Sequence, residues 1–108
     1  MEMSKKEYKR HEWRLVKVYD TKLDEMHFEI MYKVKYLWFF TGWHYIYKDA
    51  INWCKYPDEN AYTTMFYSNI AIFKDELLAR DFINFYEKYR EKMYKIEEEL
   101  SHPYIEVK

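Results

Sequence analysis

Bulky apolar side chains alternate with polar ones in the segment from Phe28 to Trp38. Its even-numbered positions carry six large residues: Phe28, Ile30, Tyr32, Val34, Tyr36 and Trp38. The odd-numbered positions are mostly charged, and only Leu37 departs clearly from the pattern. Because successive side chains of a β-strand point to opposite faces, this period of two predicts a long strand with one strongly apolar face. Another part of the chain has to cover that face.

The hydrophobic period becomes helical near the C-terminus, from about Asp75 to Leu100. One apolar stripe recurs there at spacings of three and four: Leu78, Phe82, Phe85, Tyr89, Met93, Ile96 and Leu100. Such a stripe predicts an amphipathic helix of about six turns. The face predicted to point to solvent carries charged residues: Arg80, Glu87, Lys88, Glu91, Lys95 and Glu98. We expect this helix to pack across the apolar face of the Phe28–Trp38 strand.

Two further strands are expected beside the Phe28–Trp38 strand. Trp13–Tyr19 is rich in β-branched and aromatic residues, and the polar connection Asp20–Glu25 would join it to the next strand as a hairpin. Gly42 is the only glycine of the chain, so we place the following tight turn there, since glycine adopts positive φ without steric cost. Trp43–Tyr47 then alternates again and predicts a strand that returns antiparallel.

The segment after the third strand is less regular. Ala50–Cys54 suits a short helical turn, which we expect Asp49 to cap and Pro57 to end. A fourth strand is predicted at Tyr62–Tyr67. Ile70–Phe73 either continues that strand or forms a fifth.

These elements predict an α+β fold in which an antiparallel sheet of four to five strands carries one long C-terminal helix packed across one face. The chain has 108 residues, which is enough for one hydrophobic core. We therefore expect a single domain that spans residues 1–108. Residues 1–11 are expected to form a flexible or short helical arm.

Aromatic residues make up 22% of the chain, which is more than one small core can hide. Six of them crowd the third strand and the segment after it: Trp43, Tyr45, Tyr47, Trp53, Tyr56 and Tyr62. With Lys33 and Lys35 they are the candidate partner-binding residues. Three interpretations are open: contact with a protein partner, a second small core formed when residues 49–60 fold over the other sheet face, or stacking on nucleobases with lysines at the phosphates.

The sequence offers little for catalysis or metal binding. Cys54 is the only thiol, and no histidine has another histidine two to four positions away. A chain with a single glycine cannot contain a G-x-S-x-G nucleophile elbow, a P-loop or a dinucleotide fingerprint. We therefore expect no enzyme activity, no metal site and no cofactor.

The net charge and the residue composition indicate more about where the protein works than about what it does. The formal net charge of −1 provides no overall attraction to nucleic acid. No secretory or transmembrane pattern is present in the sequence, so we expect a cytoplasmic protein that does not enter a membrane. Lysine outnumbers arginine by 14 to 4, and residues with AT-rich codons dominate, as in many bacteriophage genomes.

Two function hypotheses follow from these observations. The first is a small non-enzymatic binding protein, specifically a phage-encoded inhibitor that occupies a host macromolecular partner such as a defence-system protein in the host cytoplasm, with a homo-oligomer also compatible. The alternative is a sponge-like nucleotide- or nucleic-acid-binding protein that uses stacked Trp and Tyr with Lys.

Overall fold

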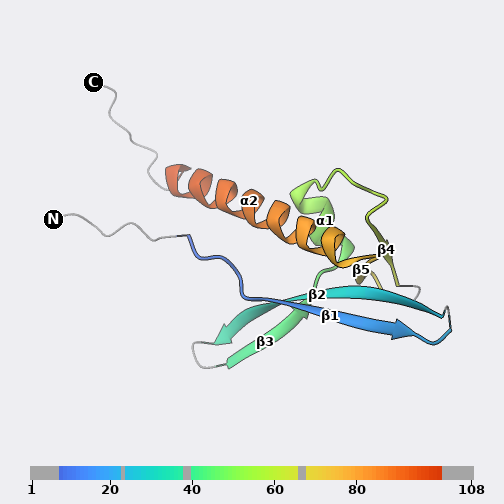
Figure 1. Cartoon of the computed structure of the whole chain (residues 1–108). Coiled ribbons are helices and arrows are strands. Elements are labelled where there is room, and N and C mark those ends of the chain that lie inside the picture. Colours follow the sequence, from blue (N-terminus) through green and yellow to red (C-terminus); the bar gives the residue numbers. More distant parts are fainter. Residues whose placement is uncertain (1–7, 23, 38–39, 66–67, 101–108) are drawn as a thin grey trace, which may run out of the picture.

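The computed structural model describes residues 8–22, 24–37, 40–65 and 68–100, with backbone alone for 35–37 and 40. A five-stranded antiparallel sheet lies against two helices in it (Figure 1), so the predicted α+β class is confirmed. The strands are β1 (Trp13–Asp20), β2 (Glu25–Leu37), β3 (Phe40–Tyr45), β4 (Tyr62–Thr64) and β5 (Ala71–Phe73). The helices are α1 (Lys48–Cys54) and α2 (Glu76–Leu100).

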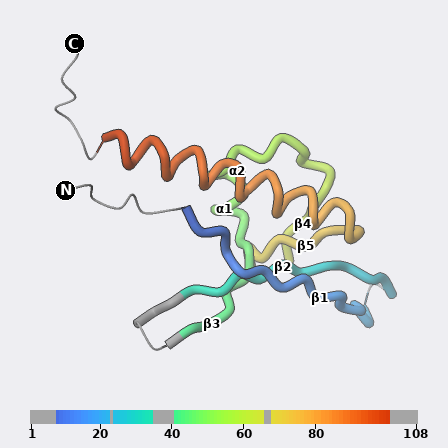
Figure 2. The backbone as a smooth tube through the Cα atoms, turned by 60° about the vertical axis from the view of Figure 1, so that its left-hand side comes forward, coloured from blue at the N-terminus to red at the C-terminus, as the bar shows by residue number. Residues whose placement is uncertain are grey.

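β2 is the central strand because its 13 residues give it room for several neighbours. On one edge it pairs with β1 along the whole length of β1. On the other edge it pairs first with β5, at Phe28 and Glu29, and then with β3 from Met31 onward. β4 extends the sheet beyond β5. The far end of β2 pairs with β3 beyond the other strands, and this two-stranded ribbon reaches away from the rest of the sheet (Figure 2).

The predicted cover for β2 is confirmed. Phe28, Ile30 and Tyr32 all point to the side where α2 lies, and Ile30 is completely buried. Across the sheet, Leu15 of β1 and Phe73 of β5 share this face, since residues directly opposite each other in a sheet point the same way. The apolar face predicted from the period of two therefore forms the sheet side of the hydrophobic core.

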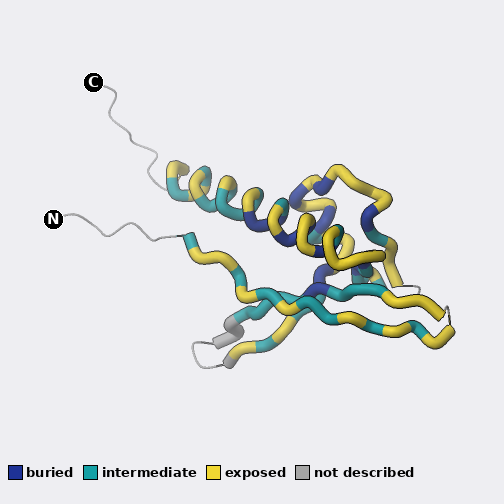
Figure 3. Tube along the Cα trace, in the orientation of Figure 1, coloured by how far each residue is buried: buried dark blue, intermediate teal, exposed yellow. Residues whose placement is uncertain are grey.

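The burial of α2 differs from the predicted stripe. Burial is concentrated between Ala79 and Glu87 (Figure 3), and the last residue of the stripe, Leu100, is 72% exposed. Glu87, which was predicted to point to solvent, is only 5% exposed, so that prediction is wrong. The reason is that the helix is amphipathic over its whole length, whereas the sheet and α1 lie under its first half only.

The turn predicted at Gly42 is also wrong. Gly42 lies inside β3, where it pairs with Val34, and it has no positive φ. The pairing of Leu37 with Phe40 brings the chain back earlier, with residues 38 and 39 between the two strands. Trp38, the last residue of the predicted strand, falls outside the described residues.

α1 confirms the short helix but not its predicted cap. The N-cap residue is Tyr47, no side chain caps the helix, and Asp49 lies in the first turn instead. Lys55 ends the helix in the left-handed region with φ of 58°. α1 lies on the same side of the sheet as α2 (Figure 1), so the segment does not form a second core on the opposite face.

Candidate binding surface

The sheet face opposite the helices is covered by no described helix or strand (Figure 1). We call it the open sheet face. Its members are Arg14, Val16, Val18 and Asp20 of β1, Glu25, His27, Glu29, Met31 and Lys33 of β2, Trp43 and Tyr45 of β3, Thr63 of β4 and Ile72 of β5. Their neighbours in sequence, such as Leu15 and Ile30, pack into the core, which fixes the side to which each of these residues points.

Trp43 is the most prominent aromatic residue of this face. Its side chain is 38% exposed, and two cations lie against its ring. The guanidinium carbon of Arg14 is 5.4 Å from the ring centroid, and Nζ of Lys33 is 6.0 Å from it. Both distances are within the range of cation–π attraction. The contacts join three strands, so they hold the side chain of Trp43 in place on the surface.

Charged residues of opposite sign lie at the two ends of the open sheet face, and Nζ of Lys33 is already 3.4 Å from Oε2 of Glu12. Arg14 and Lys33 lie at the end where β2 continues toward β3. Asp20 and Glu25 are paired at the other end, at the turn between β1 and β2. The apolar residues of the face are Val16, Val18, Met31, Tyr45 and Ile72, which we call the apolar band. The band is interrupted on β2 by Glu29, which pairs with Val16 and Ile72, and by His27, which pairs with Val18.

One further carboxylate, Glu29, lies within the apolar band and is largely buried, with 12% of its side chain exposed. Its Oε1 is 3.4 Å from Nε2 of His27 on the same face. The carboxylate therefore already has a partner within the chain.

Half of the residues predicted to bind a partner gather on or beside this surface. Trp43, Tyr45 and Lys33 belong to the open sheet face. Tyr47 lies two residues after β3, is 44% exposed and forms a bridge with Ile70. The backbone of Lys35 pairs with Thr41, and its side chain lies outside the described residues.

Three other predicted residues lie on the helix side of the sheet. Trp53 is 45% exposed and stands at 4.9 Å from the ring of Tyr89 of α2. Tyr56 is buried, and its hydroxyl donates a hydrogen bond of 3.1 Å to Asp81; burial and this contact raise the pKa of Tyr56 to about 12. Tyr62 packs on Phe73. The eight predicted residues therefore do not form one continuous surface.

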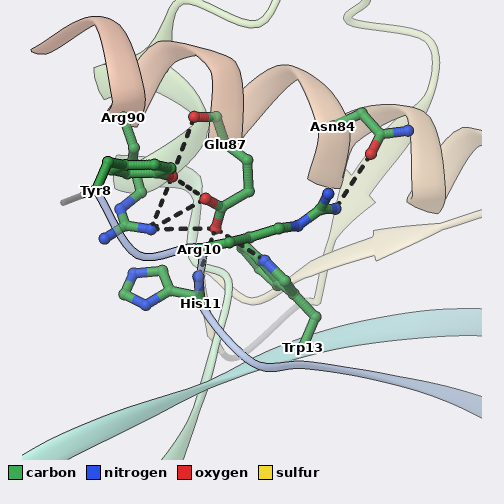
Figure 4. A network of polar contacts seen from close by, with 7 residues as sticks. All are labelled: Tyr8, Arg10, His11, Trp13, Asn84, Glu87 and Arg90. Carbon is green, nitrogen blue, oxygen red and sulfur yellow. Dashed lines mark hydrogen bonds and ion pairs between the residues drawn. The ribbon is translucent and has the colours of Figure 1, made fainter. Parts of the chain in front are cut away.

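A buried polar cluster around Glu87 was not foreseen (Figure 4). The Oε1 atom of Glu87 accepts hydrogen bonds from Nε1 of Trp13 at 2.9 Å and from the backbone N–H of His11 at 3.1 Å. Nη1 of Arg90 donates to both carboxylate oxygens at 3.1 Å, and the hydroxyl of Tyr8 donates to Oε2. These contacts attach the segment before β1 to α2.

The same cluster changes the ionisation of two side chains. Burial, followed by the hydrogen bond to Glu87, raises the pKa of Tyr8. Burial, together with the nearby charge of Arg90, lowers the pKa of His11 below its usual value of 6.5. A depression of about 350 Å³ lies beside the cluster, lined by Tyr8, Glu87 and four neighbours. Because the polar groups of Tyr8, Glu87 and Arg90 bind one another, the cluster is a structural anchor for the N-terminal segment.

No sequence pattern marked Glu87 for this role. It is preceded by the apolar residues Ile83 and Tyr86 and followed by Arg90 three positions later, which is compatible with an ordinary solvated ion pair. The one available signal was the indole N–H of Trp13, since a buried tryptophan usually finds an acceptor.

The described residues show few groups suited to chemistry. Cys54 is buried, its Sγ donates to the carbonyl of Ile51 at 3.4 Å, and burial raises the pKa of its thiol. Within the part of the chain that the structure describes, no three acidic, histidine or cysteine side chains come together as metal ligands do. Neither described helix has the length and hydrophobicity needed to cross a membrane.

Comparisons of the chain with models of protein families, with curated proteins and with solved structures found no match.

Proposed function

We propose that this protein is a small non-enzymatic binding protein that acts by occupying a macromolecular partner, and that the partner docks on the open sheet face. The observation that carries this proposal is the position of Trp43 on that face, exposed and held between Arg14 and Lys33. Tryptophan, tyrosine and arginine are the residues that most often dominate the binding energy of protein interfaces.

The chemistry of the face favours a protein over a small molecule. The face is broad and combines an apolar band, interrupted by the His27–Glu29 pair, with charged residues at both ends, and such a mixture of apolar and polar groups is typical of protein interfaces. A partner that presents an acidic group beside an apolar patch would complement Arg14, Lys33 and Trp43 together.

In its specific form, the proposal is a phage-encoded inhibitor of a host protein, such as a component of a defence system, acting in the host cytoplasm. Two features support it. The residue composition is that of an AT-rich gene, and the chain folds as one small sheet-and-helix unit with one broad uncovered face. A protein of this kind inhibits by covering a surface of its target and needs no catalytic group.

Native mass spectrometry of the protein, isolated gently from the cells that produce it, tests the proposal. We expect a complex with a protein of defined mass, and we expect Trp43→Ala combined with Lys33→Glu to abolish it. Trp53→Ala is the matched control, because Trp53 is similarly exposed but lies on the helix side. Loss of the complex in the control but not in the double variant would place the partner on the helices and contradict the proposal.

The arrangement at Trp43 also supports a second candidate, a nucleotide- or nucleic-acid-binding protein. An aromatic ring beside two cations is the combination with which proteins hold single-stranded nucleic acid. In the same experiment, this function predicts copurifying nucleic acid or an adduct of nucleotide mass. The adduct would be lost in the Trp43 and Lys33 double variant and would dissociate at high salt.

A further inference from the structure

We propose that the outer edge of β1 binds an extended segment of a partner protein, which adds a strand to the sheet and carries an acidic residue opposite Lys17. The inference goes beyond the proposed function, because a partner can dock on the open sheet face without adding a strand, and a strand can be added without contact to Trp43. It depends on three features of β1: its free edge, the backbone groups on that edge, and its charge.

β1 lies at one end of the sheet, and no described strand pairs with its outer edge (Figure 1). Its eight residues all pair with β2 in one regular register, so the free edge is continuous. The other outer strands are shorter, since β3 has six residues and β4 has three. β1 also lacks the proline and the β-bulge that close the edge strands of many proteins. The edge is therefore long enough for a partner strand.

The backbone hydrogen bonds determine which groups of β1 face outward. The N–H of Lys33 donates to the carbonyl of Glu12 at 2.9 Å, and the register continued by one residue places these two residues opposite each other. Hydrogen-bonded and non-hydrogen-bonded pairs alternate along an antiparallel ladder, so Arg14, Val16 and Val18 also bond to β2. The N–H and C=O groups that face outward, and to which an added strand would bond, belong to Trp13, Leu15, Lys17 and Tyr19.

The side chains along this edge suit a segment rich in β-branched residues. Val16 and Val18 are partly buried on the open sheet face, and Leu15 is partly buried on the side of the helices. Tyr19 is 50% exposed on the side of the helices. β-branched residues of an added strand would cover these side chains on both faces, and such cross-strand pairs stabilise sheets.

Charge determines which segment fits. Lys17 lies near the middle of β1, is exposed, and pairs with no carboxylate among the residues that the structure describes. Around it, residues 9–22 carry two carboxylates, Glu12 and Asp20, and Glu12 already pairs with Lys33. The same residues carry five cations: Lys9, Arg10, Arg14, Lys17 and Lys22. The edge therefore attracts an acidic segment, and a carboxylate opposite Lys17 would form a cross-strand ion pair.

The same charge disfavours a second copy of β1 as the added strand. In a pair of β1 strands, the excess of positive charge lies on both sides of the new ladder, whichever register the two strands adopt. A lysine on an edge strand is a common protection against such self-pairing. The occupant that fits this edge is a foreign acidic segment.

A peptide probe tests the inference. The probe is a capped peptide of about nine residues, which spans the length of β1, with a central glutamate flanked by alternating valine and threonine. Two control peptides carry glutamine or lysine in place of the glutamate. Binding to the full chain is followed by NMR, and hydrogen exchange of the backbone N–H groups of β1 is the readout.

We expect the glutamate peptide to slow the exchange of the N–H groups of Leu15, Lys17 and Tyr19, by about fourfold when the peptide is at about three times its dissociation constant. The N–H groups of Val16 and Val18 should change little, because they already bond to β2. The affinity should fall about threefold from the glutamate to the glutamine peptide, and again from the glutamine to the lysine peptide.

Lys17→Glu should reverse this preference, so that the variant binds the lysine peptide more tightly than the glutamate peptide. Lys22→Glu is the matched control. It makes the same change in net charge at an exposed position in the turn after β1, and it should keep the preference of the wild type. Both replaced side chains are exposed, so both variants should fold.

Four results would overturn the inference. The first is unchanged exchange and unchanged chemical shifts in β1 at about 1 mM glutamate peptide, where a millimolar dissociation constant would leave about half of the protein bound. The second is equal affinity for the three peptides. The third is a set of shifts confined to Met31 and Trp43, which would place the peptide on the open sheet face.

The fourth result is slow exchange of the outward N–H groups without peptide, with a rate that falls as the protein concentration rises. It would identify a second copy of the chain as the added strand. The proposed function is tested separately by the native complex and its loss in the Trp43 and Lys33 double variant. A native complex that persists while the peptide fails to bind would overturn the edge alone.

Discussion

At the scale of single residues, the carboxylate of Glu87 is the polar group that joins the segment before β1 to α2. It is 5% exposed and accepts hydrogen bonds from Tyr8, His11, Trp13 and Arg90. A buried carboxylate is costly unless cations and hydrogen-bond donors compensate it. Here three of the donors come from the segment before and at the start of β1, so the same contacts that stabilise the charge also hold that segment against α2.

Glu87→Ala should therefore be strongly destabilising. It leaves the indole N–H of Trp13 and the guanidinium of Arg90 without their acceptor in a partly buried place, and we expect the free energy of unfolding to fall by about 3 kcal/mol. Urea denaturation followed by tryptophan fluorescence measures this.

Glu91→Ala, one turn further along α2, is the matched control. Its carboxylate pairs with Lys95 at 3.4 Å, and both side chains are about half exposed or more, so its loss should cost less than about 0.5 kcal/mol. Equal effects of the two substitutions would show that the Glu87 cluster contributes no more than a surface pair.

His11 should make stability depend on pH. Its ring lies 4.9 Å from that of Tyr32, and burial lowers its pKa in the folded state below 6.5. Below pH 6.5, His11 takes up a proton in the unfolded chain, whereas the folded protein keeps its ring neutral. The stability that the neutral ring contributes is therefore fully present above pH 6.5, and it is lost as the pH falls toward the folded-state pKa.

His11→Phe keeps an aromatic ring and removes the titration. The melting temperature of the variant should fall less than that of the wild type between about pH 7.5 and about pH 5.5. Equal decreases in the two proteins would mean that His11 does not resist protonation in the fold.

At the scale of elements, the length of β2 determines how the sheet is built. β1 occupies one edge of β2, whereas β5 and β3 share the other edge one after the other. The chain therefore forms one sheet with a protruding ribbon. α2 is longer than the part of the sheet beneath it, which is why burial ends near Glu87 although the amphipathic pattern continues to Leu100.

A substitution at Gly42 tests whether this residue lies inside β3 or at a turn. Inside β3 it has no positive φ, so a side chain is sterically permitted there, and glycine within a strand loses more conformational entropy on folding than other residues do. Gly42→Ala should raise the free energy of unfolding by about 0.5 kcal/mol, measured by chemical denaturation. A loss of more than about 1 kcal/mol would indicate that the position needs the left-handed region, as in a turn.

At the scale of the whole molecule, the sheet has one face in the core and one face open. The difference between the core face and the open sheet face should be visible when two tryptophans of the sheet are mutated and the stabilities of the variants are compared. Trp13 packs at 5.5 Å from the ring of Tyr86 and donates to Glu87, whereas Trp43 lies on the open sheet face against two cations.

Trp13→Ala should lower the free energy of unfolding by about 3 kcal/mol or more, since it removes a large side chain from a packed interface between β1 and α2. Trp43→Ala should lower it by less than about 1 kcal/mol while it weakens partner binding. Both are measured by denaturation at the same dilute protein concentration. A comparable loss in the two variants would show that Trp43 is part of the fold's core.

Sequence reasoning was most successful where the pattern was long and regular. The period of two from Phe28 and the period of 3.6 after Asp75 identified the central strand and its covering helix. Sequence reasoning failed where the outcome depends on contacts with other segments. The turn expected at Gly42 lies earlier, and the cap expected at Asp49 is absent. Local propensities do not specify which residues become neighbours across a sheet.

For the candidate site, the sequence indicated that some aromatics in the 43–62 region had to lie outside the core, but not which ones. Trp43 and Tyr45 lie on the open sheet face, while Tyr56 is buried against α2. Trp43 and Tyr45 belong to β3, whereas Tyr56 follows α1, which lies on the same side of the sheet as α2.

The sequence by itself determined the α+β class, the central strand and the long helix, because hydrophobic periodicity is a local property of the chain. Tertiary structure alone decided that Glu87 is buried with partners more than 70 residues earlier, and that Arg14, Lys33 and Trp43 meet on one face. Those arrangements depend on strand register and on which side each helix packs. Both are set by contacts between distant segments, which no local pattern encodes.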